Sequence, residues 1–193
     1  MDMSLARLVT HLFAPATVLV VLCLGVGWHA DPGLTGLGWG ALVAVMCAGI
    51  PMAVIVWAMR RGDVTDVHIH HRSQRIVPLS IGVVSVLAGV ALTYGLAAPP
   101  SVSALAVALL ASIATNTLIT LMWKISFHTG VAAATVTILA LAYGLDWWTA
   151  PAIAVVVLIG WSRVSLRDHT IAQVIVGALW GAIVAGVPFE LLR

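Results

Sequence analysis

Long apolar runs, separated by short polar segments, follow one another along the whole chain. Seven runs can be marked, at about residues 8–29, 38–59, 77–97, 102–123, 129–146, 149–162 and 170–189. Turn-forming residues lie between them, such as Asp31-Pro32-Gly33 and Pro99-Pro100. Because about 20 apolar residues cross the hydrocarbon core of a bilayer, the pattern predicts successive membrane spans joined by tight hairpins, and the sixth is the shortest.

The backbone chemistry of a membrane predicts that these spans are helices. Hydrocarbon offers no partner for a free amide, and no alternating pattern of a barrel is present. The composition agrees, because 62% of the 193 residues are hydrophobic and only 8% are charged, which excludes an ordinary water-soluble domain. We expect an all-α, polytopic integral membrane helical bundle of six to seven transmembrane helices, forming a single transmembrane domain over residues 1–193.

The basic residues are distributed unevenly between the two ends of the predicted spans. One side receives Arg193 alone, and the other receives Arg7, Arg60, Arg61, Arg72, Arg75, Lys124, Arg163 and Arg167. Cytoplasmic loops carry such an excess, so we expect a multi-pass protein of the cell membrane with its polar loops in the cytoplasm. The formal charge of +2 is too small to indicate a nucleic-acid partner.

Three polar clusters lie at predicted helix ends on the basic side, at residues 68–78, 124–128 and 162–169. Ionisable groups at the edge of hydrocarbon are costly unless they face a cavity or one another, so the clusters indicate a site; interfacial anchoring is the alternative. Arginines from separate loops can bind a phosphate, and two histidines can divide nucleophilic and acid roles. The residues therefore favour phosphoryl transfer.

The carboxylates form no cluster for a divalent metal, and no metal or cofactor is predicted. In the alternative, His68, His70 and His71 ligate a metal.

The third cluster resembles the type 2 phosphatidic acid phosphatases, integral-membrane enzymes related in fold to the vanadium haloperoxidases. Ser162-Arg163, five intervening residues and His169 stand at the spacing of that family, and Gln173 occupies the position of its usual Asp. Gln at this position is similar to the dolichyl diphosphate phosphatases. The resemblance implies that His169 is the nucleophile that becomes phosphorylated and that Arg163 binds the phosphate.

The resemblance covers about residues 68–190 and extends to the other two clusters. In the second, Ser126 and His128 match the family, Phe127 stands in place of its Gly, and Lys124 is a further candidate phosphate ligand. By resemblance, His128 is the acid that protonates the leaving oxygen. In the first cluster, Arg75 aligns with the family Arg and His68 occupies the position of the family Lys. The Pro that follows the Arg in the family is displaced here to Pro78.

The residue types themselves predict one contact within the third cluster. His169 and Gln173 are four residues apart, so at the start of a helix they share a face, and the amide oxygen can accept a hydrogen bond from the imidazole. A neutral amide orients the ring but stabilises an imidazolium less than a carboxylate does.

The sequence thus predicts a lipid phosphatase embedded in the bilayer. It would hydrolyse a lipid phosphomonoester or diphosphate, with an isoprenoid diphosphate as first choice, through a phosphohistidine and without metal. Two alternatives remain open: a catalytically silent member that binds lipid phosphate or acts as a scaffold, and a small transporter. Lys124 and Arg167 can also be read as interfacial cations.

Overall fold

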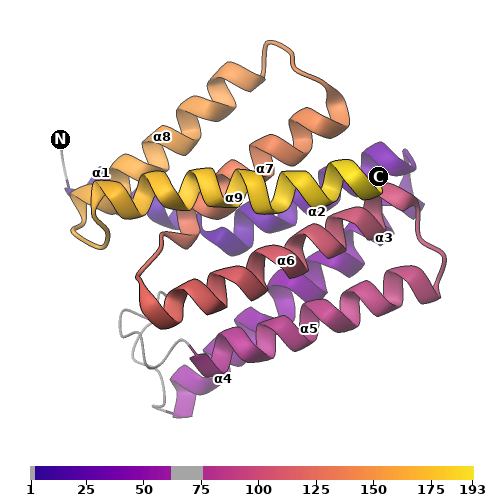
Figure 1. Cartoon of the computed structure of the whole chain (residues 1–193), viewed down its shortest axis with the longest axis horizontal. Helices are drawn as coiled ribbons and strands as arrows, with labels where there is room; N and C mark the ends of the chain where they lie inside the picture. Colours follow the sequence, from indigo (N-terminus) through magenta and orange to yellow (C-terminus); the bar gives the residue numbers. More distant parts are fainter. Residues whose placement is uncertain (1–2, 62–75) are drawn as a thin grey trace.

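The computed structural model describes residues 3–61 and 76–193, with the side chains of residues 76–79 excepted. Within these residues the chain is helical, and the helices run side by side in a bundle (Figure 1). They are α1 (Met3–Leu12), α2 (Pro15–Ala30), α3 (Leu34–Ala44), the π-helix η1 (Val45–Gly49), α4 (Ile50–Arg61), α5 (Ile76–Gly95), α6 (Pro100–Met122), α7 (Phe127–Tyr143), α8 (Thr149–Ser165) and α9 (Ile171–Leu192). The predicted all-α membrane bundle is confirmed.

Each of the seven predicted apolar runs corresponds to one helix or one broken helix. The first run is divided into α1 and α2, because Pro15 restricts the backbone of Ala14 to an extended conformation (ψ 143°). The second run is continuous from Leu34 to Arg61 but contains the π-turn η1. Pro51 follows η1, and in an unbroken α-helix its ring would clash with the carbonyl group of Cys47, so the wider turn accommodates it.

In the part of the chain that the structure describes, four helical segments are long and apolar enough to cross a membrane: Met3–Ala30, Leu34–Arg61, Pro100–Met122 and Ile171–Leu192. The helices α7 and α8 are apolar and have 17 residues each, or about 26 Å at the α-helical rise. They are somewhat shorter than the hydrocarbon core of about 30 Å. The predicted sixth span, the shortest, is thus a complete helix that extends to Ser165.

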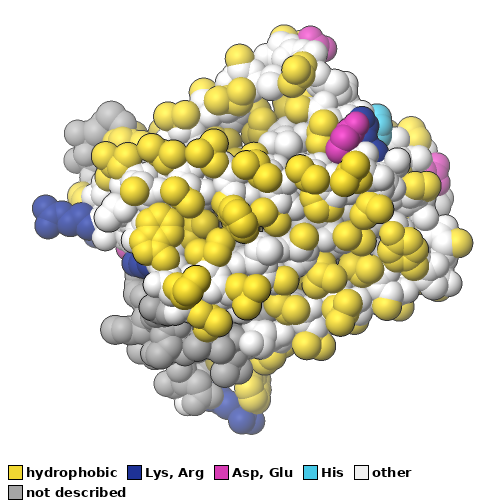
Figure 2. Space-filling model, in the orientation of Figure 1, with side chains coloured by type: hydrophobic (Ala, Val, Ile, Leu, Met, Phe, Trp, Pro, Cys, Tyr) yellow, Lys and Arg dark blue, Asp and Glu magenta, His cyan; other side chains and the backbone are white. Residues whose placement is uncertain are grey.

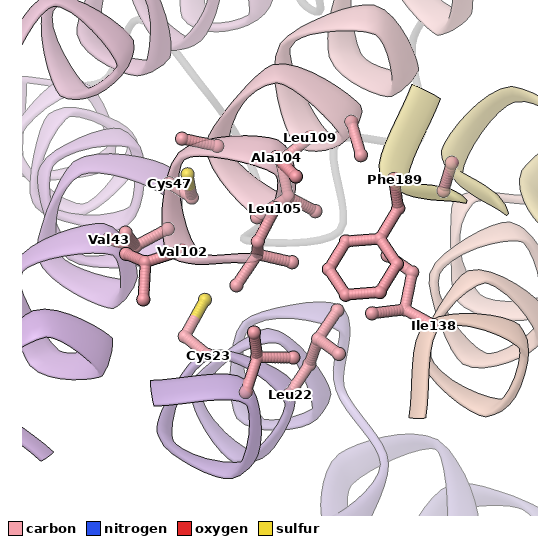
Figure 3. Close-up of a cluster of buried hydrophobic side chains, with 14 of the residues drawn as sticks. Leu22, Cys23, Val43, Cys47, Val102, Ala104, Leu105, Leu109, Ile138 and Phe189 are labelled. Atoms are coloured by element: carbon pink, nitrogen blue, oxygen red, sulfur yellow. The ribbon is translucent and has the colours of Figure 1, made fainter. Parts of the chain in front are cut away.

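The core lies where α2, α3, α6, α7 and α9 meet. Figure 3 shows side chains from these helices pointing toward one another, among them Leu22, Val43, Leu105, Ile138 and Phe189, which are all at most 1% exposed. Cys23 and Cys47 are buried in the same cluster and pack there as small side chains. Burial of small and aliphatic side chains between helices supplies the dispersion contacts that hold a bundle together in lipid.

The bundle has two ends with different chemistry. The N-terminus, the end of α4 and the connections α6–α7 and α8–α9 gather at one end, which we call the basic end (Figure 1). On the face shown in Figure 2, hydrophobic side chains cover the middle and the charged side chains lie toward the periphery. At the opposite end Arg193 pairs with Glu190 at 2.7 Å. The topology therefore brings two of the three predicted polar clusters, those in the α6–α7 and α8–α9 connections, to one end.

Candidate active site

The start of α9 fixes the side chain of Gln173. Thr170 is the N-cap residue, and its hydroxyl accepts a hydrogen bond from the backbone N–H of Gln173 at 3.3 Å. In return, the backbone N–H of Thr170 donates to Oε1 of Gln173 at 3.2 Å, which completes a capping box. Because a backbone N–H can only donate, the atom of Gln173 that faces it must be the oxygen.

The same oxygen orients His169. Its distance to Nδ1 of His169 is 3.1 Å, as the four-residue spacing predicted. Since Oε1 only accepts, Nδ1 carries the proton, and in the neutral ring Nε2 keeps its lone pair. The capping box therefore does two things: it satisfies the N-terminus of α9, and it selects the imidazole tautomer in which Nε2 is nucleophilic.

The five residues between Arg163 and His169 form a regular helix end. The N–H groups of Arg167 and Asp168 donate to the carbonyl oxygens of Val164 and Arg163, at 2.9 and 3.1 Å. These two bonds are those of a Schellman motif, in which the residue after the C-cap is left-handed. Arg167 has that conformation (φ 57°), although it is not glycine. The turn reverses the chain, so that the N–H of His169 also donates to the carbonyl oxygen of Arg163, at 3.2 Å.

Arg163 is buried and ion-paired. Its side chain is 5% exposed, and Nη2 lies 2.9 Å from Oδ2 of Asp168. A buried guanidinium without a counter-ion would be strongly unfavourable, so Asp168 compensates it. Asp168 was not among the predicted site residues, yet its spacing from Arg163 is a signal in the sequence. The Schellman turn places the residue five positions after Arg163 back over the helix end.

A second contact to Arg163 comes from the far end of the chain. Nη1 of Arg163 donates to Oγ1 of Thr10 at 3.4 Å, and Oγ1 of Thr10 lies 3.2 Å from Oγ of Ser162. The hydroxyl of Ser162 donates its hydrogen bond to the backbone carbonyl oxygen of Ile159, at 2.7 Å. Thr10 must therefore donate to Ser162 while it accepts from Arg163. Nothing in the local sequence around Thr10 indicates this role, because α1 and α8 meet only in the folded bundle.

The second predicted cluster packs directly against the third. The backbone N–H of Ser126 donates to the backbone carbonyl oxygen of Gln173 at 3.4 Å. The hydroxyl of Thr129 donates to the backbone carbonyl oxygen of Val174 at 3.1 Å. His128, 7% exposed, lies in the first turn of α7 between these two contacts. Lys124 is half-buried in the connection between α6 and α7.

Glycines allow this close approach of α7 and α9. A Cβ atom added to Gly177 would lie 2.7 Å from the carbonyl oxygen of Ser126 and 2.8 Å from Oγ1 of Thr129. A Cβ atom on Gly181 would likewise collide with the backbone of Gly130. The small-residue pair Gly177 and Gly181 therefore sets the distance between the two clusters.

Arg163 and Ser126 each carry a buried polar atom that has no hydrogen-bond partner among the residues that the structure describes. These atoms are Nε of Arg163 and Oγ of Ser126, in residues that are 4% and 1% exposed as a whole. A buried donor without a partner costs free energy, and such atoms at a cluster of this kind are suited to the oxygens of a ligand. Both are donors, which fits an anion.

The first predicted cluster is a different matter. His68 and Arg75, and the alternative metal ligands His70 and His71, lie outside the described residues, so their predicted roles are untested. Of the other site residues, Ser126, His128, Arg163, His169 and Gln173 come from segments joined by the hydrogen bonds given above.

Residues 101–192 match the family model of the PAP2 superfamily. The match supports the superfamily indicated by the sequence motifs, and its range contains the site from Ser126 to Gln173 but neither Thr10 nor the first cluster. PAP2 superfamily members are phosphatases, which supports a phosphoric-ester hydrolase in general. No curated protein and no solved structure showed significant similarity to the chain.

Proposed function

We propose that the protein is a membrane-embedded lipid phosphatase that works through a phosphohistidine on His169. The observation that carries the proposal is the 3.1 Å contact between Nδ1 of His169 and Oε1 of Gln173, next to the buried Arg163. A proton held on Nδ1 leaves Nε2 as the attacking atom, and a guanidinium held beside it binds the phosphate that is attacked.

The proposed reaction has two steps. In the first, the lone pair on Nε2 of His169 forms an N–P bond, the P–O bond to the lipid leaving group breaks, and His128 gives that oxygen a proton. In the second, His128 takes a proton from water, the oxygen of which attacks phosphorus, the N–P bond breaks, and phosphate leaves. Nε of Arg163 and Oγ of Ser126 would donate to the phosphoryl oxygens in both steps.

The proposed substrate is a lipid phosphomonoester or diphosphate, with an isoprenoid diphosphate as first choice. Gln173 in place of the usual Asp, and the apolar helices that surround the site, support this choice. Neither step uses a metal ion or a cofactor. Lys124, and His68 and Arg75 of the first cluster, are proposed as further phosphate ligands.

Phosphate release by the detergent-purified protein tests the proposal. The panel contains isoprenyl diphosphates, isoprenyl monophosphates, phosphatidate and phosphatidylglycerol phosphate, each with EDTA present. We expect release that His169→Ala abolishes and that His29→Ala, the same change at the opposite end of the bundle, leaves intact. Release that persists in His169→Ala would refute the phosphohistidine, and no release from folded wild-type protein would favour a silent lipid-phosphate binder.

We further propose that the basic end faces the cytoplasm, because eight of the nine basic residues were assigned to that side. Met122 at this end is 83% exposed, and Leu145 in the connection between α7 and α8 at the other end is 80% exposed. Cys23 and Cys47 are buried, so single Cys variants give a low background. An impermeant thiol reagent should label Leu145→Cys in intact cells and Met122→Cys only after permeabilisation. The reverse labelling would place the site on the outer face.

A further inference from the structure

An apolar groove runs along the bundle beside the candidate site. It lies between α2, α7 and α8, has a volume of about 290 Å³, and is lined by residues that include Phe13, Ala132, Trp148, Ala152 and Ile159. No charged side chain is among its lining residues. Leu12 and Val21 at its rim are each 58% exposed, so the groove is open toward the surroundings of the bundle.

One end of the groove lies at Ile159, one helical turn before Arg163 on α8. Ile159, which lines it, accepts the hydrogen bond of Ser162, the residue before Arg163. Val9, Ala132 and Ile159 form a small buried cluster at this end, and Phe13 packs against it. The groove thus begins on the two helices that supply Arg163 and its acceptor Thr10, because Leu12 of α1 and Ile159 of α8 both line it.

The other end is marked by Trp148, at the start of α8. From Trp148 to Ile159 the helix rises roughly 16 Å, at 1.5 Å per residue. Trp148 adjoins the connection between α7 and α8, at the end of the bundle opposite the basic end. A ligand that fills the groove therefore extends from one helical turn below Arg163 to the opposite end of the bundle.

The shape and chemistry of the groove select its occupant. A helix with side chains has a diameter of about 10–12 Å, so even a short piece of helix occupies far more space than the groove offers. A polar ligand would lose most of its hydrogen bonds to water here, because the lining side chains other than Thr17 and Thr135 are aliphatic or aromatic. The volume is at the lower limit of ligand pockets, which hold about 300–1,000 Å³. One hydrocarbon chain satisfies all three conditions, and two parallel chains do not.

We propose that this groove binds the single hydrocarbon chain of the lipid whose phosphate lies at Arg163 and His169. The inference rests on the proposed function and names its substrate class: lipid phosphates with one chain, as in isoprenoids, in preference to two-chain glycerolipid phosphates. Since the chain arrives from lipid and gains nothing by leaving water, the groove acts by positioning the phosphate, and its effect is on the Michaelis constant of long-chain substrates.

Photochemical cross-linking tests the location of the chain. The probe is a single-chain alkyl phosphate with a diazirine at the end of the chain, bound to the His169→Ala variant and mapped by peptide mass spectrometry. We expect cross-links on Trp148 and Ala152, and few there with the alcohol that lacks the phosphate. The same map for both probes would mean that the groove holds ordinary bilayer chains, which would overturn the proposal.

Filling the groove tests its effect on turnover. Ala152→Phe occupies the groove near its far end, whereas Ala154→Phe, two residues later on α8, places the same ring on the exposed side. We expect Ala152→Phe to raise KM for a long single-chain phosphate by about fivefold or more, with the control within about twofold and a short-chain soluble phosphate unaffected by either. Equal effects of both variants would overturn the proposal.

These experiments distinguish a failure of the proposed phosphatase from a failure of the proposed chain groove. If wild-type protein releases no phosphate from any substrate, the proposed phosphatase is refuted, while the cross-link map still reports where the chain binds. If phosphate is released from single-chain and two-chain lipids alike and Ala152→Phe changes neither KM, the phosphatase stands and the chain groove is refuted.

Discussion

Nδ1 of His169 and Oε1 of Gln173 lie 3.1 Å apart, and the same oxygen accepts a hydrogen bond from the backbone N–H of Thr170, the N-cap residue of α9. Gln173, which orients the candidate nucleophile, is therefore also a member of the capping box of α9. An amide in this position couples the tautomer of the ring to the stability of the helix end, because one atom serves both contacts.

Substitution of Gln173 separates orientation from charge. Gln173→Leu removes the acceptor, so we expect kcat to fall by about 100-fold or more because the productive tautomer is lost. We also expect the free energy of unfolding to fall by about 1 kcal/mol, because the helix cap is lost. Gln173→Glu keeps both acceptor contacts and adds a negative charge that favours the imidazolium. We expect its acid limb in the pH–rate profile to move to higher pH, because protonated His169 cannot attack.

Phosphate-release rates across pH, with thermal unfolding of each variant, measure both effects. Thr170→Ser, which retains the cap hydroxyl, serves as the control and should resemble wild type. A pH–rate profile of Gln173→Glu identical to that of wild type would show that residue 173 does not contact the titrating group.

Thr10 positions Arg163 from a helix outside the region that matches the PAP2 superfamily. Thr10→Val keeps the shape of the side chain but leaves Nη1 of Arg163 without this acceptor. We expect KM to rise roughly threefold to tenfold, in line with a lost hydrogen bond of about 1 kcal/mol, with a small change in kcat. Thr10→Ser should restore wild-type KM. Equal KM values in the Val and Ser variants would show that the hydroxyl is not used.

Arg167 adopts a left-handed conformation that favours glycine, at the end of α8. Its side chain is exposed, whereas that of Arg163 is buried. We expect Arg167→Gly to stabilise the protein by about 1 kcal/mol, the cost of that conformation for a residue with a Cβ atom, and to leave kcat/KM nearly unchanged. Thermal unfolding and phosphate release test this. A large loss of kcat/KM would instead assign the side chain of Arg167 to phosphate binding.

The crossing of α7 and α9 depends on Gly177. A methyl group there would meet the carbonyl oxygen of Ser126 at 2.7 Å, so the two helices must move apart. We expect Gly177→Ala to cost about 1–3 kcal/mol of stability and to lower kcat, since Ser126 and His128 shift relative to His169.

Gly38→Ala is the matched control, because it is also helical and a Cβ atom there has nothing within 4 Å. Alanine favours a helix over glycine, so this variant should be as stable as wild type or slightly more so. If Gly177→Ala unfolds at the same temperature as Gly38→Ala and keeps full activity, the proposed close crossing is wrong.

The sequence by itself determined the helices and one contact of the site. Membrane-length apolar runs must form helices, because lipid satisfies no backbone hydrogen bonds, and this fixed all seven segments, including the short sixth one. The pair His169 and Gln173 was likewise predictable, because a spacing of four residues on one helix is a local geometric rule.

The tertiary structure decided the rest. The turn from Arg163 to Asp168 needs a left-handed residue at Arg167, and the sequence gives no sign of it because that residue is not glycine. Thr10 contacts Arg163 although about 150 residues separate them along the chain. The groove beside the site likewise exists only where α2, α7 and α8 pack side by side. Such contacts depend on how the helices pack, and apolar helices can pack in lipid in many ways. The choice among those arrangements is made by small residues such as Gly130, Gly177 and Gly181, where backbones approach closely.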